Sequence, residues 1–314
     1  MIKIDLVTGF LGSGKTTFLK KYAAYHISQG HKIGILENDY GAVNVDMLLL
    51  GDLRGDLCEL EMVAGGCDAD CHKRRFKTKL IAMAMSGYER VIVEPSGIFD
   101  VDEFFDVLCE EPLDRFYEIG TVFAVMDART SSDLSPEAKM LLASQVANAG
   151  VVLLSKSQYA NASDIERTLQ VLQEGANKIN LRRDITSVIE KKSWDLLEEA
   201  DFERFSNAGY ELSPYVKRLS GDDHAFSTIY FLEIPMTAEH LKGICEKLFA
   251  PCAKAMFGTI FRVKGFFRED GNWYEWNATA AEESVRQIPV GQEVLIVIGE
   301  SLKEQPIREL FQAP

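Results

Sequence analysis

The run Gly9-Phe10-Leu11-Gly12-Ser13-Gly14-Lys15-Thr16 fits the pattern G-x-x-x-x-G-K-[ST] of a phosphate-binding loop. Residues 2–7 before it are typical of a strand, and residues 17–28 after it are typical of an amphipathic helix. Glycines let backbone N–H groups close around phosphate oxygens, and the N-terminus of the following helix favours the same anions. This strand, loop and helix predict a nucleotide-binding P-loop.

Each residue type in the loop has an expected role toward a bound nucleotide. Lys15 neutralises charge on the β- and γ-phosphates, and the Thr16 hydroxyl ligates Mg²⁺. We therefore give Lys15 and Thr16 catalytic as well as binding roles. The other expected nucleotide contacts in the loop are Gly9, Gly12, Ser13, Gly14 and Thr17.

Short apolar runs alternate with helical patterns through the first two-thirds of the chain. Strands are expected at residues 2–7, 32–36, 91–94, 122–126 and 151–154. Helices are expected at residues 17–28, 75–85, 101–108, 136–147 and 163–172. Strands that are apolar on both faces and alternate with helices imply a parallel sheet covered on both sides. We predict an α/β fold with the doubly wound, mainly parallel sheet of a P-loop NTPase.

The pattern changes in a polar stretch rich in Ser, Gly, Asn and Pro, at residues 206–223, which we interpret as a linker. It would separate a nucleotide-binding domain, residues 1–205, from a smaller α+β domain, residues 224–314. Asp270-Gly271 predicts a hairpin in the second domain. The strands expected there are 227–234, 259–267, 273–277, 284–288 and 294–298, and the helices are 238–249 and 303–311.

Composition excludes several classes of protein. Lys and Arg total 34 against 48 Asp and Glu, so the net charge of −14 argues against a nucleic-acid or anionic-membrane partner. The sequence shows no apolar run of the length of a membrane span, and its start lacks the shape of a signal peptide. Six cysteines in 314 residues are too few for a disulfide scaffold, which favours a reducing cytoplasm.

A second site element is the strand end Glu94-Pro95-Ser96-Gly97. Ligands of open parallel sheets bind at the carboxyl ends of the strands, so Glu94 is expected beside the phosphate loop, on Mg²⁺ or its water. We give it a catalytic role there, to position metal-bound water. The Gly97 N–H is expected to meet the γ-phosphate. The alternative is an ordinary exposed strand end.

The order and spacing of these motifs resemble those of CobW-type GTPases, relatives of HypB and UreG. Residues 8–17 closely resemble the family's phosphate loop, and residues 94–97 resemble its E-x-[ST]-G. Asn38-Asp39-Tyr40-Gly41 followed by Asp46 resembles its N-E-F-G-x-x-x-x-D, and Arg262-Val263-Lys264-Gly265 resembles its R-x-K-G strand. The resemblance extends over nearly the whole chain.

This resemblance implies a Mg²⁺-dependent nucleoside triphosphatase that couples hydrolysis to delivery of a metal or metallocofactor. The implied partners are the nucleotide and a client metalloprotein or cofactor-assembly protein, and a homodimer is left open. Asp39, in the loop whose state hydrolysis would control, is an expected nucleotide contact. A small-molecule kinase on the same loop is a rival, but it needs a substrate pocket that the sequence does not reveal.

The family marks its metal site with G-C-x-C-C, and this chain departs from that motif. The corresponding run is Gly66-Cys67-Asp68-Ala69-Asp70-Cys71-His72, followed by a basic helix. The resemblance implies a Zn²⁺ or Co²⁺ site with Glu37, Cys67 and Cys71 as ligands, because Glu37 matches an acidic position that the family uses near its metal. Asp70 or His72 would complete the shell. The alternative is that the cysteines only pack, which leaves a nucleotide-dependent protein-binding switch without a transition metal.

The motif that reads the base also departs from the family pattern. GTPases of this class use N-K-x-D, whose carboxylate accepts two hydrogen bonds from guanine. Here the strand at residues 151–154 is followed by Ser155-Lys156-Ser157-Gln158. Lys156 matches, Ser155 replaces Asn, and Gln158 replaces the carboxylate with an uncharged amide. GTP is favoured, with ATP or relaxed specificity as the alternative.

Overall fold

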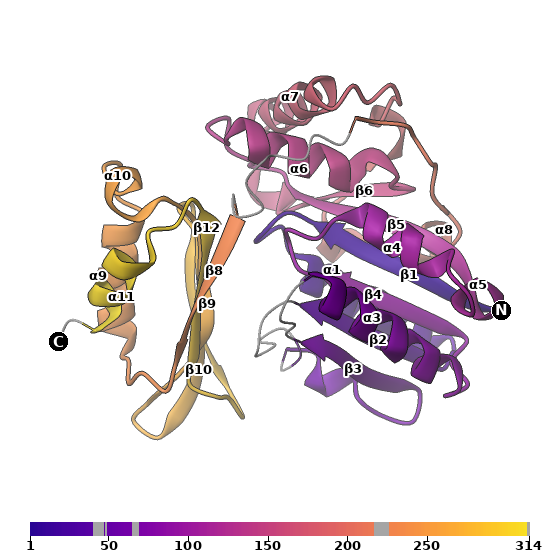
Figure 1. Ribbon diagram of the computed structural model, residues 1–314, viewed down its shortest axis with the longest axis horizontal. Helices are drawn as coiled ribbons and strands as arrows, with labels where there is room; N and C mark the ends of the chain where they lie inside the picture. Colours follow the sequence, from indigo (N-terminus) through magenta and orange to yellow (C-terminus); the bar gives the residue numbers. More distant parts are fainter. Residues whose placement is uncertain (40–46, 48, 65–68, 217–225, 313–314) are drawn as a thin grey trace. The chain divides into compact units, whose positions relative to one another are not determined.

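The computed structural model describes residues 1–39, 47, 49–64, 69–216 and 226–312. The chain divides into two compact units, Met1–Arg218 and Leu219–Pro314 (Figure 1). The division falls within the stretch that the sequence suggests as a linker, although Gly209 and Val216 still hydrogen-bond to the backbone of the first unit. In the described part of the chain, no helix is both long enough and apolar enough to cross a membrane.

The first unit is built on a seven-stranded parallel sheet in the order β3-β2-β4-β1-β5-β6-β7. The chain order reverses at β1, because β4 lies on one side of it and β5 on the other. Ligands of such sheets bind where the order reverses, at the carboxyl ends of the strands. The strands are β1 (Ile2–Gly9), β2 (Ile33–Asp39), β3 (Cys58–Ala64), β4 (Arg90–Pro95), β5 (Tyr117–Asp127), β6 (Val151–Ser155) and β7 (Ile189–Glu190).

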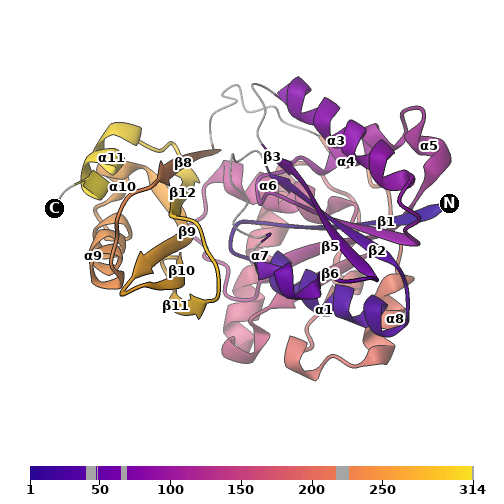
Figure 2. The ribbon, with the colours of Figure 1, turned by 90° about the horizontal axis from the view of Figure 1, so that it is seen from below.

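Helices cover both faces of this sheet, so the predicted doubly wound α/β fold is confirmed. In Figure 2, α1 and α8 lie on one side of the strands, and α3 and α4 lie on the other. Two separate apolar cores result, one beneath α1 and α8 and one beneath α3 to α7. The helices are α1 (Lys15–Ser28), α3 (Ala69–Ala84), α4 (Val101–Leu108), α5 (Leu113–Phe116), α6 (Pro136–Ala147), α7 (Ala162–Lys178) and α8 (Glu199–Ser206).

Sequence patterning missed β3, β7, α5 and α8. In β3, Glu59 and Glu61 alternate with buried Cys58 and Leu60, as in a strand at a sheet edge with one face to solvent. These charges interrupt the apolar run by which the central strands are found. β7 has only two residues and α5 only four, too few for a period to be detected.

The second unit is an α+β domain, as expected, and its five-stranded antiparallel sheet has the order β11-β10-β9-β12-β8. Its helices lie together on one side of this sheet and bury one apolar core (Figure 1). Asp270 and Gly271, both with positive φ, form the tight turn between β9 and β10. The elements are β8 (Phe226–Leu232), α9 (Ala238–Leu248), α10 (Lys254–Phe257), β9 (Thr259–Glu269), β10 (Asn272–Ala278), β11 (Glu283–Ile288), β12 (Val294–Glu300) and α11 (Glu304–Gln312).

Candidate functional site

The phosphate loop connects β1 to α1 and is pressed against β5. A Cβ on Gly9 would lie 2.2 Å from the carbonyl oxygen of Val125, so only glycine fits there. Gly14 has a left-handed φ of 95° and precedes the first residue of α1. The Ser13 N–H donates to the Phe10 carbonyl at 3.1 Å and closes the turn. These constraints hold the loop's backbone at the start of a helix, where N–H groups can donate hydrogen bonds to phosphate oxygens.

Lys15 folds back over this loop. Its Nζ donates to the carbonyl oxygen of Gly9 at 3.2 Å, and only 8% of the residue is exposed. The first residue of α1 therefore holds its ammonium group across the loop. An ammonium in this position can neutralise phosphate charge.

The Thr16 hydroxyl donates to Glu94 Oε1 at 2.8 Å. Thr16 is in the first turn of α1, and Glu94 is near the carboxyl end of β4, which pairs directly with β1. A hydroxyl and a carboxylate are hard oxygen ligands of the kind that Mg²⁺ prefers. The predicted closeness of the loop and Glu94 is thus present, and the donor set fits Mg²⁺.

Glu37 lies next to Glu94 in the sheet. The two residues are paired across the parallel strands β2 and β4, so their side chains point to the same face of the sheet. That face carries α1 and the phosphate loop. Both carboxylate residues are 3% exposed.

Gly97 packs directly against the phosphate loop. A Cβ at this position would lie 2.8 Å from the backbone nitrogen of Leu11. Gln145, on α6, donates to the Gly97 carbonyl at 3.0 Å. The strand end from Glu94 to Gly97 is therefore packed beside the loop and is not an exposed strand end. Its contact with a γ-phosphate stays a prediction.

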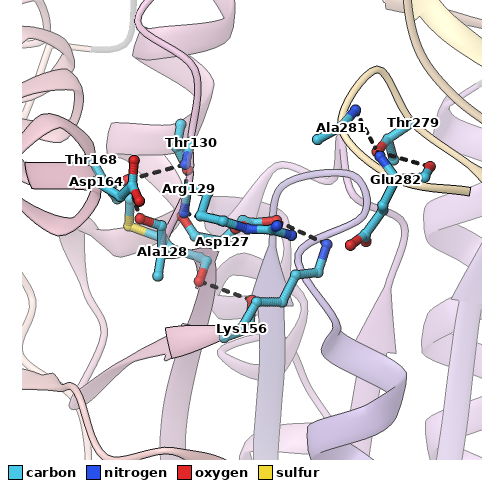
Figure 3. Close-up of polar contacts among 12 residues, drawn as sticks. Asp127, Ala128, Arg129, Thr130, Lys156, Asp164, Thr168, Thr279, Ala281 and Glu282 are labelled. Carbon is cyan, nitrogen blue, oxygen red and sulfur yellow. Dashed lines mark hydrogen bonds and ion pairs between the residues drawn. The ribbon is translucent and has the colours of Figure 1, made fainter. Parts of the chain in front are cut away.

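The predicted base-reading segment follows β6, beside the same loop. A Cβ on Gly14 would lie 3.7 Å from Cβ of Ser155, whose hydroxyl donates to the Met126 carbonyl at 3.1 Å. Lys156 has a left-handed φ of 56°, and its Nζ pairs with Asp127 Oδ2 at 2.8 Å (Figure 3). Gln158 is exposed, in the short 3₁₀ turn Ser157–Tyr159.

The turn that carries Asp127 is itself held by hydrogen bonds (Figure 3). The other carboxylate oxygen, Oδ1, accepts from the backbone N–H of Arg129 at 2.8 Å. From α7, the Thr168 hydroxyl accepts from the Thr130 N–H at 3.0 Å and donates to the Ala128 carbonyl at 2.9 Å. Asp127 thus has a fixed orientation from which it holds the ammonium group of Lys156.

Sequence reasoning missed Asp127, Gln145 and Trp194. The benzo edge of Trp194 lies against the loop, because a Cβ on Gly14 would be 3.3 Å from Cη2 of this indole. Trp194 also packs against Phe18 of α1, with ring centroids 5.7 Å apart. The position of Asp127 at the end of β5 was a usable signal. No pattern marks Gln145 or Trp194, because their role depends on tertiary packing alone.

The predicted metal ligands are only partly described. Cys67 lies outside the described residues. So do residues 40–46, the rest of the predicted loop from Asn38 to Asp46 whose state hydrolysis would control. Asp39 is the last residue of β2. Cys71 is in the first turn of α3 and partly exposed. Within the described ranges, no three His, Cys, Asp or Glu side chains are grouped to hold a metal ion. The set of Glu37, Cys67 and Cys71 stays a prediction, as does the nucleotide contact of Asp39.

The first unit matches a known family over most of its length. The family model described as the CobW/HypB/UreG nucleotide-binding domain matches residues 3–186, which is more than half of the chain. The chain belongs to the CobW/HypB/UreG family. The match includes the phosphate loop, Glu94, Gly97 and the Ser155–Gln158 segment, and it confirms the resemblance drawn from these motifs.

Relatives within this family include two from Escherichia coli (strain K12). The zinc chaperone YjiA is 29% identical over 202 residues, which cover 60% of this chain and 57% of YjiA. The zinc chaperone YeiR is 28% identical over 171 residues, which cover 54% of this chain and 51% of YeiR. The matched segments therefore span less than two thirds of the length of either relative. A solved structure of Zn(II)-bound YjiA GTPase from E. coli aligns over 99% of this chain and 98% of that one, at 22% identity and a TM-score of 0.37.

Proposed function

We propose that this protein is a Mg²⁺-dependent GTPase that couples hydrolysis to delivery of Zn²⁺, or of another ion bound by thiolates, to a client metalloprotein in the cytoplasm. The observation that carries the nucleotide half of the proposal is the hydrogen bond between Thr16 and Glu94 at the phosphate loop. It joins the first turn of α1 to the carboxyl end of β4 at the point where the strand order reverses. Membership of the CobW/HypB/UreG family supports the coupling to a metal.

Thr16 and Glu94 would hold Mg²⁺, which when bound supplies positive charge to the phosphates. Lys15 adds a second positive charge from across the loop. Gly97, whose carbonyl accepts from Gln145 and which packs against Leu11, offers an N–H beside the same loop. Phosphoryl transfer depends mainly on positioning and charge stabilisation, and these residues supply both.

GTP is the proposed nucleotide because Lys156 occupies the lysine position of N-K-x-D and is held by Asp127. Gln158 offers guanine one amide oxygen where the family motif offers a carboxylate. We therefore propose a preference for GTP over ATP that is weaker than that of an N-K-x-D protein.

The proposed cargo is zinc because two relatives are named zinc chaperones and because Cys67 and Cys71 supply soft ligands. The adjacent parallel strands β2 and β3 end together at one edge of the sheet, at Asp39 and Ala64, and the predicted loop after Asp39 and the segment with Cys67 follow them in the sequence. Loss of the γ-phosphate at that edge could reorder both segments. The altered cysteine motif favours one alternative, a switch that binds proteins without a transition metal.

Hydrolysis is tested by measuring phosphate release from GTP and ATP. We expect Lys15→Ala to abolish turnover and to weaken nucleotide binding, because the loop loses its charge. Lys21→Ala is the matched control, since Lys21 is on the same helix and forms an exposed pair with Asp195 at 3.7 Å. Unchanged turnover in Lys15→Ala would place the active site elsewhere. A phosphorylated acceptor in place of free phosphate would support the kinase alternative.

A further inference from the structure

A buried hydrogen bond joins the end of β2 to the first turn of α3. The Asn38 side-chain oxygen lies 2.7 Å from Nε2 of His72, and each residue is 0% exposed. Because an amide oxygen only accepts, His72 Nε2 carries the proton and donates it to this bond. The two residues are 34 positions apart in the sequence, so the contact exists only in the folded protein.

Asn38 is also bonded to the strand that carries Glu94. Its backbone carbonyl accepts from the Ser96 N–H at 3.0 Å. Ser96 directly precedes Gly97, which is packed against Leu11 of the phosphate loop. One residue, Asn38, therefore connects the peptide beside the phosphate loop to α3.

The neighbours of this junction are the residues on which the proposed function depends. Asn38 follows Glu37 in β2, and His72 follows Cys71 in α3. A second connection runs from α3 to the Glu110 carboxylate just after α4, through Lys73 at 3.3 Å and Lys77 at 2.7 Å. These two lysines hold the pKa of Glu110 below its usual value. That connection is partly exposed and therefore weak, whereas leaving a buried donor without its acceptor is costly.

We propose that Asn38 and His72 are positioning residues that transmit the nucleotide state from the Ser96–Gly97 segment to the Cys71 end of α3. When that segment shifts with the γ-phosphate, the Ser96 N–H moves, and the Asn38 carbonyl bonded to it moves with it. His72 then either moves with the amide oxygen of Asn38 or loses this buried hydrogen bond. If His72 moves, the first turn of α3 moves with it. This inference rests on the proposed function for the site that it couples, and it assigns His72 Nε2 to Asn38 rather than to a metal.

The test measures Cys71 alkylation in metal-free protein, with GDP or with a non-hydrolysable GTP analogue bound. Fragment-ion mass spectrometry separates Cys71 from Cys67. In the wild type we expect the Cys71 rates in the two states to differ by about 5-fold or more, the lower range of allosteric coupling. His72→Phe keeps a ring but removes the donor, and should bring this ratio close to one. His72→Gln restores an N–H donor and should restore most of the ratio.

Two further variants complete the test. Asn38→Leu removes the acceptor at similar volume and should repeat the loss, which keeps the test available if His72→Phe does not fold. Lys77 is on α3, the helix that carries His72, and Lys77→Ala removes its ion pair with Glu110. This variant should keep the wild-type ratio. Nucleotide affinity, measured for each variant, reports whether the phosphate loop is intact.

The proposal is overturned if His72→Phe and Asn38→Leu bind nucleotide and keep the wild-type ratio. It is equally overturned if the wild type shows no difference between the two nucleotide states. Because no metal is present in this assay, failure of wild-type zinc binding or phosphate release counts against the proposed function alone.

Discussion

Gly97→Ala places a methyl group between the end of β4 and the phosphate loop. The added Cβ would lie 2.8 Å from the backbone nitrogen and 2.9 Å from Cα of Leu11. Ordinary carbon contacts begin at about 3.5 Å, so one of the two segments must retreat by roughly 0.7 Å. Gln145 holds the Gly97 carbonyl, so we expect the loop at Leu11 to move.

The cost of this movement should appear as lost nucleotide affinity. Overpacking a tight contact costs about 1–3 kcal/mol. If the loop regains its present geometry only when nucleotide is bound, the strain makes the free energy of nucleotide binding less favourable by the same amount. It corresponds to an affinity roughly 5- to 150-fold weaker. If the Gly97 N–H also meets the γ-phosphate, the triphosphate loses more affinity than the diphosphate.

The assay is calorimetric titration of Gly97→Ala with GDP and with a non-hydrolysable GTP analogue. Gly55→Ala is the matched control in the same unit, because a Cβ there would meet no atom within 4 Å. Affinities of Gly97→Ala within about twofold of the wild type for both nucleotides would refute the reasoning, because twofold is less than the lower limit of the expected strain.

The remaining predictions concern Mg²⁺ and the base. Glu94→Gln should lower single-turnover phosphate release by on the order of 100-fold while nucleotide still binds, because it removes the carboxylate charge that organises Mg²⁺ and water. Equal losses of binding and turnover would contradict that role. Gln158→Asp should raise the preference for GTP over ATP by about tenfold or more in side-by-side binding measurements, because a charged acceptor is restored. A wild type already strictly specific for guanine would mean that another residue reads the base.

Much of the fold and the nucleotide site could be predicted because the signals were local. The loop pattern from Gly9 to Thr16 depends on backbone N–H groups and one lysine, all within eight residues of sequence. Glu94 could be placed beside it because parallel strands bring their carboxyl ends to one edge of the sheet. The central strands were found because they are apolar on both faces.

Other features depend on contacts between distant parts of the chain. Trp194 reaches Gly14 from 180 positions away, and Gln145 reaches Gly97 from another helix. His72 looked like a candidate ligand because of its neighbours Cys67 and Cys71, but its Nε2 is bonded to Asn38. The edge strand β3 escaped detection because an exposed face needs no apolar residues.

The coupling of metal binding to the nucleotide state is tested most directly by calorimetric titration with Zn²⁺ in each nucleotide state. The wild type should bind Zn²⁺ stoichiometrically, with proton release as the thiols ionise. The affinity should differ between the GDP form and the GTP-analogue form, and zinc must change the relative affinity for the two nucleotides by the same factor. The double variant Cys67→Ser/Cys71→Ser should lose the metal and keep the nucleotide. Equal zinc binding by the two proteins, or none by either, would contradict the account and favour a nucleotide switch without a transition metal.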